Sequence, residues 1–147
     1  MPIVYSKTKK DFLGDVLNGN LKDEVYLSFV RELGQSTNRS QKNAWDNSLQ
    51  YMSTIMQDPE IPLNSGVAIE YKIPRTTNRI DFIITGTGED KKYSAIIIEL
   101  KQWSEGVHLS DKDGIVETDF FGEVAHPCYQ AWSYSSLIED YNEDVRN

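Results

Sequence analysis

Three features are scarce in this sequence of 147 residues, and each absence excludes a class of protein. The single cysteine, Cys128, cannot form an internal disulfide, which fits a reducing compartment. The longest apolar run, around Ala95 to Ile98, is far too short to cross a bilayer. The N-terminus shows no apolar segment followed by a small-residue cleavage site, so we expect no secretory signal. These absences predict a cytoplasmic protein without a membrane association.

Basic residues are also few. The chain has 15 Lys and Arg against 23 Asp and Glu, which gives a net charge of −8. Proteins that bind phosphate backbones usually present a basic surface, so nucleic-acid binding would need metal ions or a partner to offset the carboxylates. The simplest interpretation of the charge is a soluble surface. With 39% hydrophobic and 26% charged residues, the composition is typical of a globular protein, and the length predicts one domain.

The first 62 residues predict helices. Thr8, with Asp11 three residues later, resembles a capping box and begins the first helix. Gly34 fits the end of the second helix, and Pro59 ends the third. The predicted apolar faces of the second and third helices are Val25, Tyr26, Phe29, Val30 and Leu33, and Trp45, Leu49, Met52, Ile55 and Met56.

Residues 63–147 predict a sheet followed by a helix. Apolar and polar residues alternate in 67–73 and again in 79–84, which favours two strands joined by a turn. The segment 93–103 is nearly all apolar, as expected of a central strand covered on both faces. A short hairpin around Asp113–Gly114 is possible from the sequence, and a helix follows Pro127. The sequence therefore predicts a three-strand meander that precedes a C-terminal helix.

Charged residues interrupt the apolar pattern where the third predicted strand ends. Glu99 and Lys101 are two residues apart, so their side chains share a face. If the first two strands share one core, Tyr71 lies opposite Phe82, and Glu70 and Asp81 point together to the other face. We therefore expect these four charged side chains to converge at one end of the sheet.

Such a cluster suits a hard divalent cation. Two carboxylates, a backbone carbonyl at residue 100 and waters would satisfy Mg²⁺ or Mn²⁺, and the ion would activate a water and neutralise a phosphate. Lys101 could orient the attacking water or stabilise the phosphate. A half-exposed salt bridge, Glu99 with Lys101 or Asp81 with Arg79, explains the same residues without a function. Both interpretations stay open at this point.

The spacing carries a resemblance to a known superfamily. "RID", then 17 residues, then "ELK" resembles the D…(D/E)-x-K signature of the PD-(D/E)xK nucleases, and "QAWSY" resembles the Q-x-x-x-Y motif of their RecB-like branch. The resemblance implies that Asp81 and Glu99 bind a metal, with Glu70 as a further candidate, and that Lys101 is the catalytic lysine. Gln130 and Tyr134 would support the site or touch the nucleic acid, although an ordinary amphipathic helix also pairs residues at this spacing.

Longer stretches, including "GVAIEYKIPRTTNRIDFIITG" and "HPCYQAWSYSSLIEDYNE", resemble the N-terminal region of bacterial nuclease–helicase fusions whose helicase is Schlafen-group-3-like. No Walker A pattern is present, so this chain has no helicase motor of its own. The resemblance implies an α/β (α+β), restriction-endonuclease-like domain over 1–147, with N-terminal helices packed on a mixed central sheet. It further implies DNA, with RNA as an alternative, as the substrate, and a helicase domain in cis or in trans. The last strand of the nuclease core is not evident, which leaves open that the chain is a piece of a longer protein.

Two other features keep alternatives open. The acidic balance and the missing strand also fit a nuclease-like fold that binds nucleic acid or a protein partner without cleaving. Trp45, Trp103 and Trp132 could stack on bases, but their periodic apolar neighbours favour packing in or beside the core. The acidic residue that this superfamily carries on its first helix has two candidates here, Glu24 and Glu32, and surface solvation explains both.

Overall fold

A computed structural model of the chain describes residues 3–34, 36, 39–103 and 106–141. These residues form four helices and two antiparallel sheets, which confirms a mixed α and β architecture. In chain order, the elements are β1 (Ile3–Thr8), α1 (Lys9–Leu17), α2 (Leu21–Leu33), α3 (Arg39–Met56), β2 (Gly66–Lys72), β3 (Arg79–Thr87), β4 (Tyr93–Ile98), β5 (Val107–Leu109), β6 (Ile115–Thr118), β7 (Gly122–Ala125) and α4 (Pro127–Tyr141).

The larger sheet has the strand order β1-β2-β3-β4. Every pairing among these strands is antiparallel, so the mixed sheet expected from the sequence is wrong for the part of the chain that the structure describes. The helical character expected of the first 62 residues is also incomplete, because β1 lies there and pairs with β2. The strand was missed because its last residue, Thr8, is also the N-cap of α1, so the start of the helix obscures the end of the strand.

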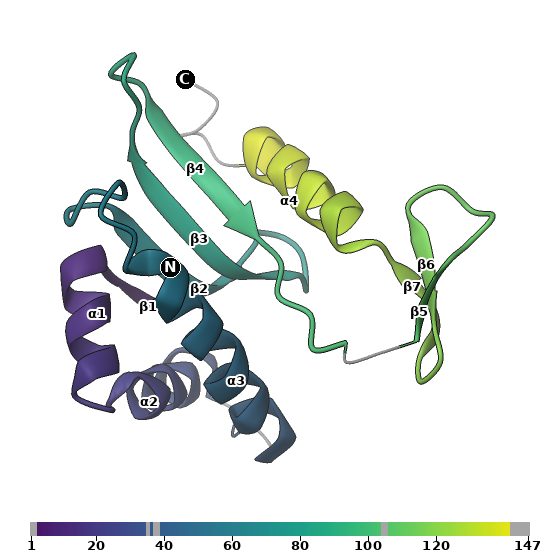
Figure 1. The fold of residues 1–147 in the computed structure, drawn as a ribbon, viewed down its shortest axis with the longest axis horizontal. Coiled ribbons are helices and arrows are strands. Elements are labelled where there is room, and N and C mark those ends of the chain that lie inside the picture. Colours follow the sequence, from purple (N-terminus) through teal and green to yellow (C-terminus); the bar gives the residue numbers. More distant parts are fainter. Residues whose placement is uncertain (1–2, 35, 37–38, 104–105, 142–147) are drawn as a thin grey trace.

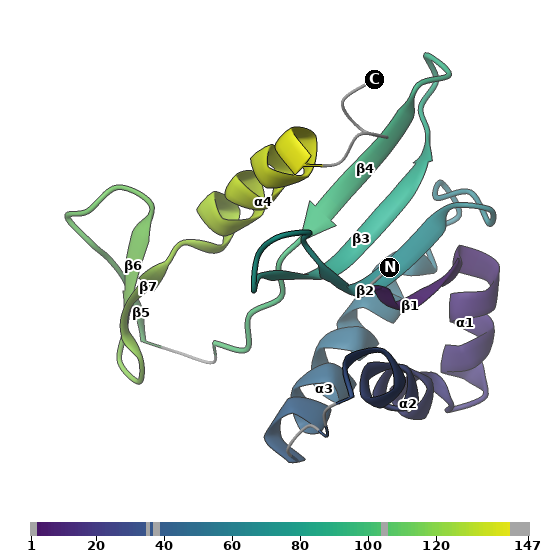
Figure 2. The same cartoon turned by 180° about the vertical axis from the view of Figure 1, so that it is seen from behind.

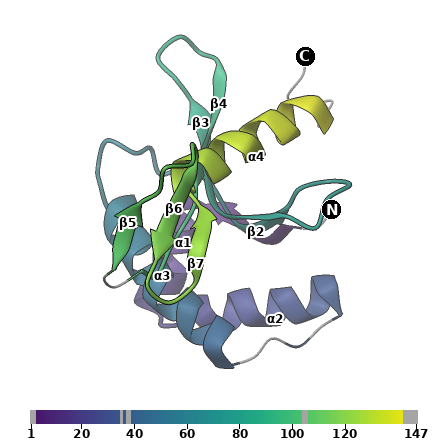
Figure 3. The same cartoon turned by 90° about the vertical axis from the view of Figure 1, so that its right-hand side faces the viewer.

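Helices cover the two faces of this sheet unequally. The helices α1, α2 and α3 lie on one face, and α4 lies alone on the other (Figures 1 and 3). The first face carries the larger core, in which Phe12 and Met52 are fully buried. The second face carries a smaller cluster that includes Ile80 and Tyr134. The sheet is thus the middle layer between a three-helix layer and a single helix.

Strand β2 contributes to both cores because its backbone changes direction at Glu70. This residue has φ 56°, a left-handed conformation that is uncommon for any residue other than glycine. Ile69 packs against the α1–α3 side, whereas Tyr71 packs against the α4 side. The prediction that alternate residues of this strand share one face was therefore wrong. The same split occurs in β3, where Phe82 and Ile80 belong to different clusters.

The register between β2 and β3 differs from the prediction. Tyr71 pairs with Ile80, and Ile69 pairs with Phe82, so Tyr71 does not lie opposite Phe82. Strand β4 was also expected to be central, but within the described residues it is the outer strand of its sheet. Its residues from Tyr93 to Ile96 are exposed. The apolar composition of this strand therefore does not reflect burial on both faces.

Several local predictions are confirmed. The Thr8 side chain accepts a hydrogen bond from the Asp11 N–H at the start of α1. Gly34 ends α2 in a left-handed conformation, with its N–H donating to the Val30 carbonyl. Ile55, by contrast, is 51% exposed, so it does not belong to the buried face of α3. The Leu33 side chain lies outside the described residues.

The strands β5, β6 and β7 form a small sheet that stands beside the N-terminal end of α4 (Figure 2). Its first turn contains Asp113 and Gly114, which confirms the predicted hairpin, but β7 was not predicted. None of the four helices in the described ranges is long and apolar enough to cross a membrane.

Candidate carboxylate site

Three carboxyl groups form a row across neighbouring strands. Glu70 on β2 and Asp81 on β3 occupy facing positions in the antiparallel register. The last pair between β3 and β4 is Phe82 with Ile98, and Glu99 follows it, beside Asp81. The row lies where β4 ends and where the backbone of β2 is turned by its left-handed residue. The convergence of these residues at one end of the sheet, expected from the sequence, is present.

The Glu99 carboxylate is held by two donors on one oxygen. Lys101 Nζ lies 2.7 Å from Oε1, and Gln130 Nε2 donates to the same atom at 2.7 Å. The second oxygen, Oε2, is buried and has no hydrogen-bond donor among the described residues. The side chain of Glu99 is only 4% exposed, against 28% for Lys101. A buried carboxylate oxygen without a donor is costly, and it usually marks a missing cation, proton or water.

Helix α4 supplies the remaining support of Glu99. The Gln130 side-chain nitrogen also lies 2.7 Å from the Tyr134 hydroxyl, so one amide group connects Glu99 to Tyr134 of α4. Tyr134 is 8% exposed and belongs to the cluster beneath α4. Residues four apart share a helix face, which is why the two side chains meet. The structure therefore brings Gln130 and Tyr134 to the row.

Asp81 is fixed by the backbone that leaves β4. Its Oδ2 accepts a hydrogen bond from the Leu100 N–H at 2.8 Å. The next residues continue to α3, where Gln102 Nε2 donates to the Ala44 carbonyl at 2.7 Å and lies 3.2 Å from the Ser48 hydroxyl. The segment that carries Glu99 is thus bound on both sides, by α4 and by α3.

Glu70 is held from the α3 side. The Trp45 indole N–H donates to Glu70 Oε1 at 2.8 Å, and Glu70 is 6% exposed. Trp45 is 5% exposed and packs on Phe29, with ring centroids 5.1 Å apart. The preference for core packing of this tryptophan is confirmed, but sequence reasoning missed its hydrogen bond.

The three carboxyl groups all have a raised pKa. Burial is the largest cause for each, because it disfavours the charged form, and it raises the pKa of Glu70, Asp81 and Glu99. Donors act in the opposite direction, but they do not cancel the effect of burial. The charge of Asp81 raises the pKa of both glutamates further. A cation placed among these groups would relieve this repulsion.

The alternative of a plain ion pair is also visible at the site. Lys101 and Glu99 form one at 2.7 Å, so their contact alone does not distinguish a catalytic pair from a structural pair. Arg79 lies over the Phe29 ring, with its Cζ 5.3 Å from the centroid, and its Nη1 is buried without an acceptor in the described part of the chain.

Sequence reasoning did not indicate two residues that contact the site, Trp45 and Gln102. The role of an indole or amide side chain cannot be recognised in the sequence, because it depends on which strand the side chain faces in the fold.

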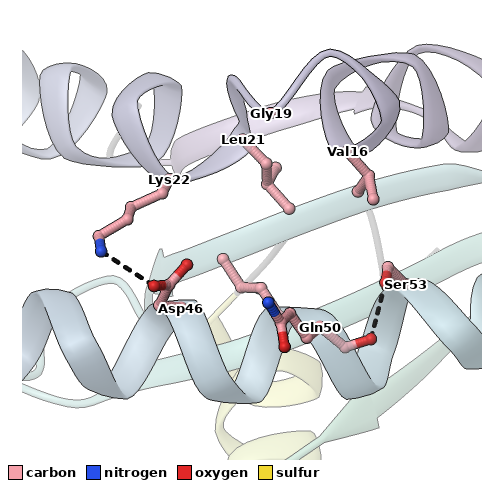
Figure 4. Close-up of a pocket in the computed structure, with 8 residues that line it drawn as sticks. Val16, Gly19, Leu21, Lys22, Asp46, Gln50 and Ser53 are labelled. Atoms are coloured by element: carbon pink, nitrogen blue, oxygen red, sulfur yellow. Dashed lines mark hydrogen bonds and ion pairs between the residues drawn. The ribbon is translucent and has the colours of Figure 1, made fainter.

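A separate cavity lies between the α1–α2 turn and α3 (Figure 4). It has a volume of about 160 Å³, and an ion pair between Lys22 and Asp46 crosses it at 3.0 Å. None of the residues that line it belongs to the carboxylate row. The carboxylate row therefore does not line this cavity.

Among the described residues, no group of three or more His, Cys, Asp or Glu side chains is arranged to hold a metal ion. Comparison of the chain with protein-family models, with curated proteins and with solved structures finds no match.

Proposed function

We propose that this protein is a metal-dependent nuclease that hydrolyses DNA phosphodiester bonds. The observation that carries the proposal is that Glu99, beside Asp81, has a buried Oε2 to which no described residue donates, while Lys101 contacts its Oε1. A structural ion pair would be expected to satisfy both oxygens or to leave the free oxygen in water. The resemblance of the sequence to PD-(D/E)xK nucleases supports the same function and a restriction-endonuclease-like fold.

The residues present fit a hard divalent cation. Carboxylate oxygens are the ligands that Mg²⁺ and Mn²⁺ prefer, and Asp81 and Glu99 would hold the ion, with Glu70 as a third candidate. When bound, such an ion supplies a more acidic water and a positive charge beside the phosphate. The raised pKa values of the three carboxyl groups support this assignment, because a cation would stabilise their charged forms.

The chain's own residues would orient the reaction. Lys101 Nζ is partly exposed, so it can donate to an attacking water or to a phosphate oxygen. Gln130 keeps Glu99 in place through a bond anchored on Tyr134. The Leu100 N–H fixes the Asp81 carboxylate. Asp81 lies on β3 and Gln130 and Tyr134 lie on α4, and the hydrogen bonds from Gln130 and Lys101 hold Glu99 directly after β4. Such support gives the rigidity that a catalytic site requires.

A cleavage assay tests the proposal. We expect the protein to cut single- or double-stranded DNA only with Mg²⁺ or Mn²⁺, and we expect Asp81→Ala to reduce cleavage to the metal-free level. Lys101→Ala should lower the rate by about 10²–10³-fold, as for the loss of one donor to a reacting oxygen. Lys112→Ala is a matched control, because Lys112 pairs with Glu123 in the small sheet, at 2.6 Å. Equal cleavage by the wild type, Asp81→Ala and Lys101→Ala would rule out this site.

The acidic surface favours a second candidate, a nuclease-like domain that binds without cleaving. Phe120 and Phe121 are 87% and 65% exposed in the small sheet, where a partner could cover them. The net charge of −8 disfavours a bare phosphate backbone as that partner. Calorimetry distinguishes the two candidates: the absence of Mn²⁺ binding, together with retained binding of DNA or of a protein partner, would favour the binding domain.

By resemblance to nuclease–helicase fusions, we further propose that the domain acts together with a helicase, either in cis or in trans. A stimulation of metal-dependent cleavage by a helicase that unwinds the same DNA would support this pairing.

A further inference from the structure

Trp45 and Glu70 form a buried polar contact that the proposed reaction does not itself require. The indole N–H donates to the carboxylate at 2.8 Å, and both side chains are almost fully buried. Trp45 comes from α3, 25 residues before Glu70 in the chain. This bond therefore ties the three-helix layer to one member of the carboxylate row.

The backbone at Glu70 is an unusual place for a glutamate. A left-handed φ of 56° is strained for a residue other than glycine. Glycine or asparagine would adopt it at a lower cost. Part of the reason is structural, since the turn of the backbone lets Ile69 and Tyr71 face different cores. That reason explains the conformation, but it does not explain why a glutamate occupies it.

The side chain supplies the missing reason. Glu70 faces Asp81 in the register between β2 and β3, and Glu99 follows β4 beside Asp81. A buried carboxylate without a donor is costly, so it would turn away from this position. The Trp45 N–H supplies a donor at 2.8 Å and keeps the Glu70 side chain in place.

Helix α3 also reaches the other end of the row. Gln102 donates to the Ala44 carbonyl, which belongs to the residue immediately before Trp45. One helix turn thus fixes Glu70 directly and fixes, through Gln102, the segment that carries Glu99 and Lys101. Helix α4, on the other face of the sheet (Figure 1), holds Glu99 through Gln130.

We infer that Trp45 is a positioning residue of the carboxylate site, which sets Glu70 in its strained conformation so that it faces Asp81 and Glu99. The inference rests on the proposed function, since its purpose is to preorganise a divalent-cation site. It adds α3 as a supporting element that no motif in the sequence indicates. Gln102 has the same role for the segment after β4.

Calorimetric titration of the whole chain with Mn²⁺ tests the inference separately from catalysis. Trp45→Phe keeps an aromatic ring in the core and removes the N–H. We expect it to weaken Mn²⁺ binding about tenfold, which corresponds to 1.4 kcal/mol. Leu49→Val is the matched control, because Leu49 is buried on α3 one turn later and contributes packing alone. It should lower the melting temperature and leave the Mn²⁺ affinity within about twofold.

The outcomes separate the two proposals. No Mn²⁺ binding by the wild type would overturn both. Tight binding by the wild type with equal affinity in Trp45→Phe would overturn the inference and leave the proposed function standing. So would equal weakening by Trp45→Phe and Leu49→Val, since packing would then explain the loss. Gln102→Ala, at an exposed position, covers the case in which Trp45→Phe does not fold: it should weaken Mn²⁺ binding about threefold, and unchanged affinity would count against the inference.

Discussion

Asp15 and Glu99 are both partly enclosed carboxylates that accept two hydrogen bonds on one oxygen, but their environments act in opposite directions. Asp15 Oδ2 accepts from Tyr5 and from Lys7, each at 2.6 Å. Burial works to raise the pKa of Asp15, but the bonds from Lys7 and Tyr5 outweigh it and lower that pKa. Around Glu99, burial and the charge of Asp81 outweigh the bond from Lys101, so its pKa is raised.

The difference lies in the neighbours rather than in the number of donors. Each carboxylate has an ammonium group beside it, but the Asp15 side chain is 19% exposed, as in an ordinary structural ion pair. The Glu99 side chain is 4% exposed, its Oε2 has no donor within the described part of the chain, and a second carboxyl group lies beside it. Stability alone would not select the second arrangement. Groups whose pKa is shifted by burial and by like charges are candidates for function.

The largest expected effect is the coupling between Trp45 and Glu70. In a double-mutant cycle with Trp45→Phe and Glu70→Gly, each single variant leaves a buried partner unsatisfied, whereas the double variant removes both. We expect a coupling of about 2 kcal/mol from urea unfolding, as for a buried hydrogen bond to a charge. The matching cycle of Tyr5→Phe with Asp15→Asn should couple by about 1 kcal/mol or less, because that site is more exposed. If the effects of Trp45→Phe and Glu70→Gly on the free energy of unfolding were additive, the contrast between the carboxylate row and the Asp15 site would be contradicted.

A smaller effect is expected from neutralising each carboxylate. Asp15→Asn loses the ion pair with Lys7, which is 33% exposed, so unfolding should become easier by about 0.5–1 kcal/mol. Glu99→Gln removes a charge that burial disfavours in the folded state, so its melting temperature should rise. For a chain of this size, about 1 kcal/mol corresponds to roughly 2–4 °C. A lower melting temperature for Glu99→Gln would show that its carboxylate stabilises the fold.

The smallest effect concerns pH. The folded state holds a proton on Glu99 above the ordinary carboxyl pKa, so the wild type loses stability as pH rises through the raised value. Asp15 has a lowered pKa, so its contribution is lost as pH falls below the ordinary carboxyl range. Melting curves should therefore show that the advantage of Glu99→Gln over the wild type grows from pH 4 to pH 8. The deficit of Asp15→Asn should shrink toward pH 3. If the difference in melting temperature between either variant and the wild type did not change with pH, the contrast between the two sites would be contradicted.

Much of the site could be predicted because it depends on short-range geometry. The two-residue spacing brings Lys101 to Glu99, and the four-residue spacing brings Gln130 to Tyr134. The approach of Asp81 to Glu99 needed only antiparallel neighbours. The nuclease activity, the metal and the DNA substrate stay predictions, since none of them follows from these contacts alone.

Other features could not be predicted from alternation. An alternating pattern assumes extended backbone throughout, and the left-handed Glu70 breaks that assumption. As a result, Ile69 and Tyr71 of β2 pack in different cores. The register with β3 is the same on both sides of Glu70, and it differs from the expected one because alternation alone does not fix which residues pair. Strand β4 looked central because composition does not say whether a neighbour lies beyond it.

The sequence by itself determined which residues could form the site, since charges placed at the end of an apolar strand and four residues apart on a helix meet through local geometry. It also determined the helix caps at Thr8 and Gly34, which depend on backbone groups nearby. Only the tertiary structure decided that Trp45 binds Glu70 and that Gln102 binds α3. These contacts join residues 25 or more positions apart, and their partners are set by how the helices pack on the sheet.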